Sequence, residues 1–197
     1  MQNVLKLGCV LMASGTASRF GKNKLEAEFC GTTLFCSALK SIPKDAFNEV
    51  IVVVSNEAHE ALAKDFGFCT IINTAPSLGQ SHTISLGVRA LFKMDALMFM
   101  VADQPLLTQK TICALISFYK KNQSSIVAPS YMGRRGNPCI FPKEFFTSLL
   151  ELKGDVGGNE VIKANENRLK LYEIKDAREL IDVDTPEALS LLEALKD

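Results

Sequence analysis

The feature that most constrains the fold is a set of short apolar runs that lack polar alternation. Residues 51–54 read Ile-Val-Val-Val, and the runs at 7–13 and 96–102 are similarly apolar. A strand with one face in water alternates polar and apolar residues, whereas a strand covered on both faces does not. These runs therefore predict parallel strands buried between two layers.

Segments with helical periodicity alternate with these strands. The helices are expected at 57–66, 81–92 and 108–121, and two weaker strands at 70–73 and 125–128. Asn56 and Thr108 precede two of the helices, where their side chains can act as N-caps. This order predicts an α/β protein, built as a three-layer α/β/α sandwich around a mostly parallel sheet.

The regular alternation of strands and helices ends after Pro129. Strands are expected at 139–141 and 169–174, helices at 144–152, 161–165 and 185–196, and loops at 133–138 and 154–158. A chain of 197 residues suits one domain, and no linker, repeat or low-complexity segment divides it. We therefore expect one domain whose C-terminal portion faces a substrate.

Charge and composition exclude several classes of function. The 22 basic and 22 acidic residues give a net charge of +0, so no bulk field favours a nucleic acid or a membrane surface. No apolar stretch approaches the roughly 20 residues of a membrane helix, and the N-terminus lacks signal-peptide features. The six cysteines show no C-x-x-C spacing, which disfavours a zinc site. We expect a cytoplasmic protein without nucleic-acid or membrane partners.

A glycine-containing, basic segment follows the first strand. Residues 14–24 read Ser-Gly-Thr-Ala-Ser-Arg-Phe-Gly-Lys-Asn-Lys. Backbone N–H groups in such a turn can cradle phosphate oxygens, and Arg19 and Lys24 add positive charge. It is not a Walker A motif, because five residues separate Gly15 from Gly21 and Asn23 stands where Ser or Thr would bind magnesium. A plain strand-to-helix connection remains the alternative.

Two acidic segments are candidates for a metal site. Asp103 follows the strand at 96–102, at the carboxyl end where open α/β sheets bind ligands. Asp182 and Asp184 flank a valine at strand-like spacing, so their side chains point opposite ways. Carboxylate oxygens are preferred ligands of Mg²⁺. Capping of the following helix is the alternative for each segment.

Three further segments carry polar residues. The segment 79–83 (Gly-Gln-Ser-His-Thr) opens a helix whose N-terminus could attract an anion, although a well-capped helix explains it equally well. His82 is a weak candidate for a general base, because no partner residue is visible. Arg134 and Arg135 could bind a second anionic substrate; they and the segment 154–158 could also be solvated turns.

Taken together and in order, these segments resemble the MobA-like NTP transferases, the family of molybdenum cofactor cytidylyl- and guanylyltransferases. The resemblance runs from Leu11 to Glu187. It is carried, in chain order, by the segments 12–24, 103–105, 135–138, 154–157 and 182–186. Each segment alone is weak evidence, whereas the five in this order are strongly specific.

The resemblance implies a GT-A-like fold and an Mg²⁺-dependent transfer of NMP from an NTP to a phosphorylated acceptor, with release of pyrophosphate. The expected catalytic residues are Lys24, Arg19 and Asp103, and the expected Mg²⁺ ligands are Asp103 and Asp184. The residues expected to contact the nucleotide are Ala13, Ser14, Gly15, Arg19, Lys24, Gly79, Gln80 and Ser81. Those expected to contact the acceptor are Arg135, Asn137 and Asp155. The single domain 1–197 would then have a nucleotide-binding part over about 1–129 and an acceptor-binding part over about 130–197.

Departures from the family pattern leave the base open. Met12 and Ser14 replace the usual Leu and Ala close to where the base should bind. The segments around Asn137 and Asp155 are closer to the cytidylyl branch, which favours CTP over GTP. The implied acceptor is molybdopterin carrying molybdenum, with a molybdoenzyme or its maturation chaperone as an expected partner.

Two other functions stay open. One is a nucleotidyltransferase that loads a sugar phosphate or another small phosphate. The other is a non-catalytic carrier of a pterin cofactor, which has little need of the magnesium site that Asp103 and Asp184 imply.

Overall fold

The computed structural model describes residues 4–15 and 23–194. The strands are β1 (Leu7–Ala13), β2 (Glu28–Phe29), β3 (Thr32–Thr33), β4 (Glu49–Val54), β5 (Cys69–Ile72), β6 (Ala96–Val101), β7 (Ile126–Tyr131), β8 (Arg134–Arg135), β9 (Cys139–Pro142) and β10 (Leu169–Glu173). The α-helices are α1 (Leu34–Ser41), α2 (Glu57–Asp65), α3 (Gln80–Ala90), α4 (Gln109–Lys120), α5 (Phe146–Glu151), α6 (Asn159–Ala164) and α7 (Pro186–Ala194). Each strand and helix predicted from the sequence is therefore present, with its ends shifted by a few residues.

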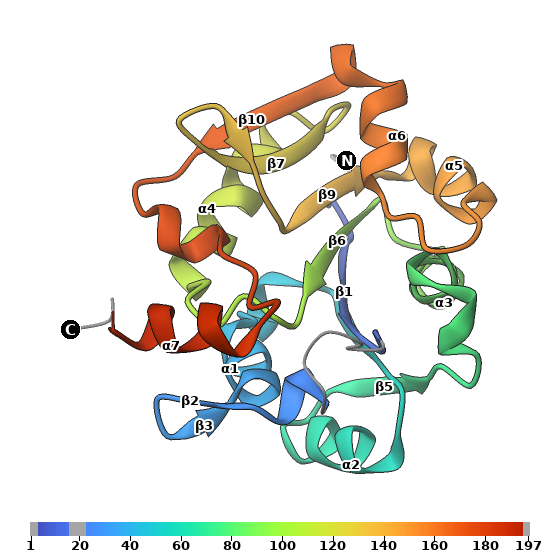
Figure 1. Ribbon diagram of the computed structural model, residues 1–197. Helices are drawn as coiled ribbons and strands as arrows, with labels where there is room; N and C mark the ends of the chain where they lie inside the picture. The colour runs from blue at the N-terminus through green and yellow to red at the C-terminus, as the bar shows by residue number, and fades with distance from the viewer. Residues whose placement is uncertain (1–3, 16–22, 195–197) are drawn as a thin grey trace.

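The main sheet has the strand order β10-β7-β9-β6-β1-β4-β5 (Figure 1). The central strand β1 pairs in parallel with β4 and β6, and β4 pairs in parallel with β5. Strand β9 runs antiparallel to β6 and β7, and β10 is parallel to β7. The predicted, mostly parallel sheet is confirmed, and its antiparallel pairings all involve β8 or β9.

Helices cover both faces of this sheet. Along β1, Cys9 and Leu11 belong to a core cluster with residues of α1, α2 and α4, whereas Val10 packs with residues of α3, α5 and α6. Figure 1 shows α3, α5 and α6 on one side of the central strands and α1 and α4 on the other. Because successive side chains of β1 enter different cores, every position must be apolar. The three-layer α/β/α prediction is confirmed.

Two helices begin at the predicted N-caps. The Asn56 side-chain oxygen accepts a hydrogen bond from the His59 backbone N–H at 2.8 Å, and the Thr108 hydroxyl accepts one from the Thr111 N–H at 3.2 Å. A third cap, Thr33, starts α1 by accepting from the Cys36 N–H. The sequence analysis did not locate α1 or the small hairpin of β2 and β3 before it.

The segment 133–138 was expected to be a loop, and this expectation was wrong for its first residues. Arg134 and Arg135 form β8, which pairs antiparallel with β7. Met132 and Gly133 both have positive φ angles, 49° and 77°, as a two-residue type I′ hairpin turn requires. Methionine rarely adopts this backbone conformation, so the sequence did not indicate a hairpin.

After β10 the chain returns to the end of β6. The Val183 N–H donates to the Asp103 carbonyl oxygen at 2.9 Å. Val183 and Leu192 pack with Phe29 and Leu34 in a small core cluster, separate from the two main ones. This docking brings the segment 182–184 to the carboxyl end of the central strands. In the described ranges, no helix is long and apolar enough to span a membrane.

Candidate active site

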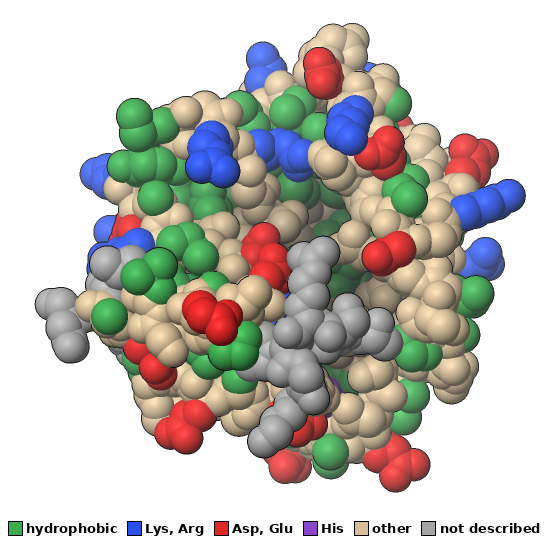
Figure 2. Space-filling model, in the orientation of Figure 1, with side chains coloured by type: hydrophobic (Ala, Val, Ile, Leu, Met, Phe, Trp, Pro, Cys, Tyr) green, Lys and Arg blue, Asp and Glu red, His purple; other side chains and the backbone are tan. Residues whose placement is uncertain are grey.

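A cavity of about 540 Å³ opens at the carboxyl ends of β1 and β6. Figure 2 shows the hollow on this face, with acidic side chains at its edge. Its lining comes from segments far apart in the chain: Met12, Ala13, Ser14, Gly15, Asn23, Lys24, Leu25, Pro76, Ser77, Gly79, Gln80, Thr83, Val101, Ala102, Asp103, Asp155 and Asp184. This is the sheet edge at which parallel α/β folds bind ligands.

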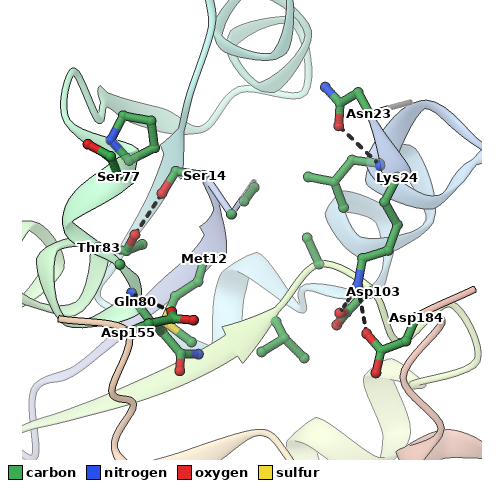
Figure 3. A pocket seen from close by; sticks show the side chains of 17 residues that line it. Met12, Ser14, Asn23, Lys24, Ser77, Gln80, Thr83, Asp103, Asp155 and Asp184 are labelled. Carbon is green, nitrogen blue, oxygen red and sulfur yellow. Dashed lines mark hydrogen bonds and ion pairs between the residues drawn. The ribbon is translucent and has the colours of Figure 1, made fainter. Parts of the chain in front are cut away.

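A lysine and two aspartates form one wall of the cavity (Figure 3). The Lys24 ammonium lies 2.6 Å from an Asp103 carboxylate oxygen and 3.1 Å from an Asp184 oxygen. Lys24 begins a 3₁₀ turn, Lys24–Glu26, which Asn23 caps by accepting from the Leu25 N–H. Burial alone would lower the pKa of Lys24, but Asp103 and then Asp184 hold it above its usual value. Lys24 therefore stays charged.

The acidic groups around Lys24 outnumber it. Desolvation by the surrounding protein, together with the charge of Asp103, raises the pKa of the Asp182 carboxyl to about 6, although the amide of Gln104 and the charge of Lys24 oppose the rise. Asp103 Oδ1 and Gln104 Oε1 are buried and have no hydrogen-bond partner among the described residues. A buried oxygen without a donor is costly, so this wall favours an additional cation or donor.

The opposite wall, termed the neutral wall, is built mainly of uncharged hydrogen-bonding groups; the carboxylate it carries, Asp155, accepts from the Gln80 N–H. Ser14 follows β1, Asn73 follows β5, and Thr83 lies in the first turn of α3. Their side chains bond to one another, and their exposed fractions are only 1%, 1% and 4%. Figure 3 shows Ser14 and Thr83 across the cavity from Lys24.

The start of α3 is held by the loop at 154–158. The Asp155 carboxylate accepts from the Gln80 N–H at 3.2 Å, and the Ser81 hydroxyl donates to the Gly154 carbonyl at 2.7 Å. Gly79 has a φ of 83°, and a Cβ there would lie 2.5 Å from the Asp155 backbone nitrogen. Glycine at 79 is thus required both by the backbone conformation and by the close approach of the loop.

Most of the predicted site residues meet at this one cavity. Ala13, Ser14, Gly15, Lys24, Gly79, Gln80, Asp103, Asp155 and Asp184 all line it. Ser81 is buried behind the lining, with its hydroxyl on Gly154. Arg19 lies outside the described residues.

Two residues expected to contact the acceptor lie elsewhere. Arg135 and Asn137 are not among the lining residues; the Arg135 guanidinium donates to the Asn159 side chain and to the Cys139 sulfur. Asp155, grouped with them in the sequence analysis, lies instead beside Gly79 and Gln80.

Sequence reasoning missed Asn73, Pro76 and Ser77. Pro76 and Ser77 line the cavity, and Asn73 supports it from behind. The available signal was positional: Asn73 is the polar residue that ends the apolar run at 70–73, and such a residue lies at the carboxyl edge of the sheet.

The strand order and the helical layers are those of the GT-A-like fold, and the cavity lies at the carboxyl ends of β1 and β6. The chain belongs to the MobA-like NTP transferase family, whose domain matches residues 9–169.

Similar proteins agree with this assignment. The purine catabolism protein PucB of Bacillus subtilis is 29% identical, and the match covers 93% of this chain and 94% of PucB. The crystal structure of Rv0371c from Mycobacterium tuberculosis superposes with a TM-score of 0.81 at 17% identity, covering 98% of this chain and all of that one. A further structure of Rv0371c is a complex with manganese.

A molybdopterin-guanine dinucleotide biosynthesis protein A from Archaeoglobus fulgidus superposes with a TM-score of 0.68 at 15% identity, covering 96% of this chain and 98% of that one. At this level of identity, the structural likenesses establish the fold.

Proposed function

We propose that this protein is a Mg²⁺-dependent nucleotidyltransferase that transfers NMP from an NTP to a phosphorylated acceptor and releases pyrophosphate. The observation that carries the proposal is the division of one cavity into two walls. Lys24, Asp103 and Asp184 supply charge on one wall, and Ser14, Gly79 and Gln80 supply neutral hydrogen-bonding groups on the other. A nucleoside triphosphate has the matching division between its phosphates and its nucleoside.

The charged wall would hold the triphosphate. Lys24 and Arg19 would bind its oxygens and neutralise the charge that gathers on the leaving pyrophosphate. Phosphoryl-type transfer depends on in-line positioning and charge stabilisation more than on covalent catalysis. The catalytic residues of the proposal are therefore Lys24, Arg19 and Asp103.

The residues present fit a magnesium ion. Asp103 and Asp184 both lie close to the Lys24 ammonium, so their oxygens already face one cationic group, and the second Asp103 oxygen has no donor. The described part of the chain contains no group of three metal-ligating side chains, as suits Mg²⁺, which combines one or two carboxylates with substrate phosphates and water. When bound, the ion would neutralise the triphosphate and polarise its α-phosphate. The manganese complex of Rv0371c supports a divalent ion.

The neutral wall would hold the nucleoside. Ala13, Ser14, Gly15, Gly79 and Gln80 line it. Ser81 would act indirectly, because its hydroxyl fixes the loop at 154–158 against the start of α3.

The nucleotide and the acceptor are the finer parts of the proposal. We favour CTP over GTP, because the segments around Asn137 and Asp155 are closer to the cytidylyl branch. The acceptor would be a molybdopterin-type phosphate bound through Arg135, Asn137 and Asp155. Residues 1–129 would then bind the nucleotide and 130–197 the acceptor, within one domain. A molybdoenzyme or its maturation chaperone would receive the product.

A pyrophosphate-release assay tests the proposal. The protein is incubated with Mg²⁺, each of the four NTPs in turn, and molybdopterin carrying molybdenum; release is expected with CTP and, more weakly, with GTP. A parallel panel of sugar phosphates and other small phosphates separates the acceptor classes. Release with a sugar phosphate and not with the pterin would move the function to that class. Tight pterin binding without release from any NTP would favour a carrier.

A further inference from the structure

Three buried polar side chains form a hydrogen-bonded network at the neutral wall of the cavity. The Ser14 and Thr83 hydroxyl oxygens lie 2.7 Å apart. The Asn73 side-chain nitrogen lies 3.2 Å from the Ser14 oxygen and 3.3 Å from the Thr83 oxygen. Ser14 and Thr83 line the cavity and Asn73 does not, so Asn73 supports the pair from behind.

The Asn73 amide has a fixed orientation. Its oxygen accepts from the Ala75 N–H at 2.9 Å, and its own backbone N–H donates to the Val54 carbonyl at 2.7 Å. The NH₂ group is therefore the end that faces the two hydroxyls. Because that group only donates, both hydroxyl oxygens act as its acceptors.

The two hydroxyls have one proton more than the hydrogen bond between them uses. The two hydroxyls carry two protons, and one of them lies in the short bond between the oxygens. For the other proton, the described residues offer no acceptor, and both hydroxyls belong to the cavity lining. The pair is thus set to donate one hydrogen bond into the cavity.

We propose that Asn73 is a positioning residue that makes the Ser14–Thr83 pair present a single O–H donor to the nucleotide. The inference rests on the proposed function and extends it. The atom that receives this donor is an acceptor on the base or the ribose, because Lys24 and its aspartates form the opposite wall.

Replacing Asn73 by aspartate reverses this arrangement with little change in shape. One carboxylate oxygen keeps the bond to the Ala75 N–H, as Asn73 does now. The other oxygen can only accept, so it draws both hydroxyl protons toward itself. The cavity then faces two oxygens with no proton to donate.

The test measures binding by calorimetry in Mg²⁺ for wild type and Asn73→Asp, with CTP and with inorganic triphosphate as probes. The variant should bind CTP about tenfold more weakly, the size expected for one lost hydrogen bond. Its affinity for inorganic triphosphate should be unchanged. In turnover, KM should rise while kcat changes less.

Two further variants sharpen the test. Asn48→Asp is the matched control, because the Asn48 oxygen accepts from the Leu7 N–H and its residue is not part of the cavity lining; it should bind CTP normally. The double variant Ser14→Ala/Thr83→Val removes both hydroxyls without adding charge, and it should lose about as much CTP affinity as Asn73→Asp. With 2′,3′-dideoxy-CTP, a penalty that vanishes assigns the acceptor to a ribose hydroxyl, and one that persists assigns it to the base or to the ribose ring oxygen.

The outcomes separate the two proposals. If wild type binds no nucleoside triphosphate, the proposed function fails and this inference fails with it. If wild type binds CTP and either altered protein binds it equally well, Asn73 has no positioning role and the function stands. Equal weakening of CTP and of inorganic triphosphate by Asn73→Asp would show a general effect of charge, which also overturns the inference.

Discussion

At the scale of single residues, the cavity assigns charge and hydrogen bonding to different side chains. Lys24 contacts Asp103 and Asp184, whereas Ser14 and Thr83 bond to each other and to Asn73. If the proposed function holds, a substitution on the charged wall should mainly weaken binding of the phosphates, and one on the neutral wall should mainly weaken binding of the nucleoside.

Asp103→Ala should abolish most turnover while the protein still folds. Asp103 supplies both the closest partner of Lys24 and the buried oxygen that has no donor. Loss of one such electrostatic group costs about a hundredfold or more in kcat. Pyrophosphate release measures the loss of turnover, and circular dichroism measures whether the protein still folds. Asp65→Asn, at the exposed end of α2, is the control; a fully active Asp103→Ala protein would remove Asp103 from the proposed metal site.

His59 should make the fold sensitive to acid. Its ring is buried, contacts the Phe35 ring in a tilted arrangement at a centroid distance of 4.6 Å, and lies 3.8 Å from a Glu26 carboxylate oxygen. Burial lowers its pKa below the usual value, although Glu26 opposes the shift. The unfolded chain thus takes up the proton first as pH falls through about 6.5, so this part of the stability is present above that pH and lost below it.

Thermal unfolding of wild type and His59→Phe between pH 7.5 and 5.5 measures this effect. The Tm of wild type should fall relative to that of the variant as the pH is lowered, because phenylalanine keeps a ring at this position and cannot be protonated. A Tm difference that does not change with pH would contradict the prediction.

At the scale of elements, the critical junction is the start of α3. Gly79 combines a positive φ with a close approach to Asp155, and the loop at 154–158 caps the helix through Asp155 and Ser81. The neutral wall is therefore built from two elements that depend on each other.

Gly79→Ala should destabilise the protein and also weaken nucleotide binding. Gly133→Ala is the matched control, because Gly133 has a φ of 77° but open space where a Cβ would go. Backbone strain alone costs roughly 1 kcal/mol or more, and only Gly79→Ala adds a clash that displaces the loop. Urea unfolding together with calorimetry compares the two; equal stability losses with intact CTP binding in both variants would refute the role of this junction.

The sequence predicted elements best where each residue's environment is dictated locally. The run at 50–55 has no polar alternation and becomes β4, and Thr108 caps α4 as expected. Strand β8 escaped prediction because its turn relies on a methionine with positive φ, which tertiary context stabilises. Strands β2 and β3 escaped prediction because two residues each are too few to show a pattern. Helix α1 escaped it because its eight residues are fewer than the window of about 11–18 in which helical periodicity is read.

At the scale of the whole molecule, the sheet determines which site residues meet. Parallel strands end at one edge, so the sequence could predict that Ser14 and Asp103 lie near each other. It could not predict that Asp155 joins Gly79, or that Asn73 supports Ser14, because these contacts cross 76 and 59 positions of the chain and depend on the packing of α3.

Ligand binding should stabilise the entire fold. A nucleotide that binds the folded chain alone contributes about 2.7 kcal/mol at a hundredfold excess over its Kd, which corresponds to several degrees in Tm. We expect CTP with Mg²⁺ to raise the Tm more than GTP with Mg²⁺, and EDTA to remove most of the gain. Differential scanning fluorimetry with each NTP measures this order, and a Tm that responds to none of them would contradict a nucleotide-binding function.

The docking of the segment 182–184 has a consequence for folding. Asp184 reaches Lys24 across 160 positions of the chain. The chain around it is held mainly at the surface, by the Val183–Asp103 backbone hydrogen bond, by hydrogen bonds that Gln104 and Thr108 donate to Leu180 and Glu179, and by the small cluster around Val183. Contacts of such long range form late, and weakly anchored segments open locally without global unfolding. Amide hydrogen exchange should therefore protect β1, β4 and β6 more strongly than residues 181–194. The charged wall would be the last part of the molecule to assemble and the first to be lost on heating, so the arrangement of Lys24, Asp103 and Asp184 can be lost while the sheet is still native.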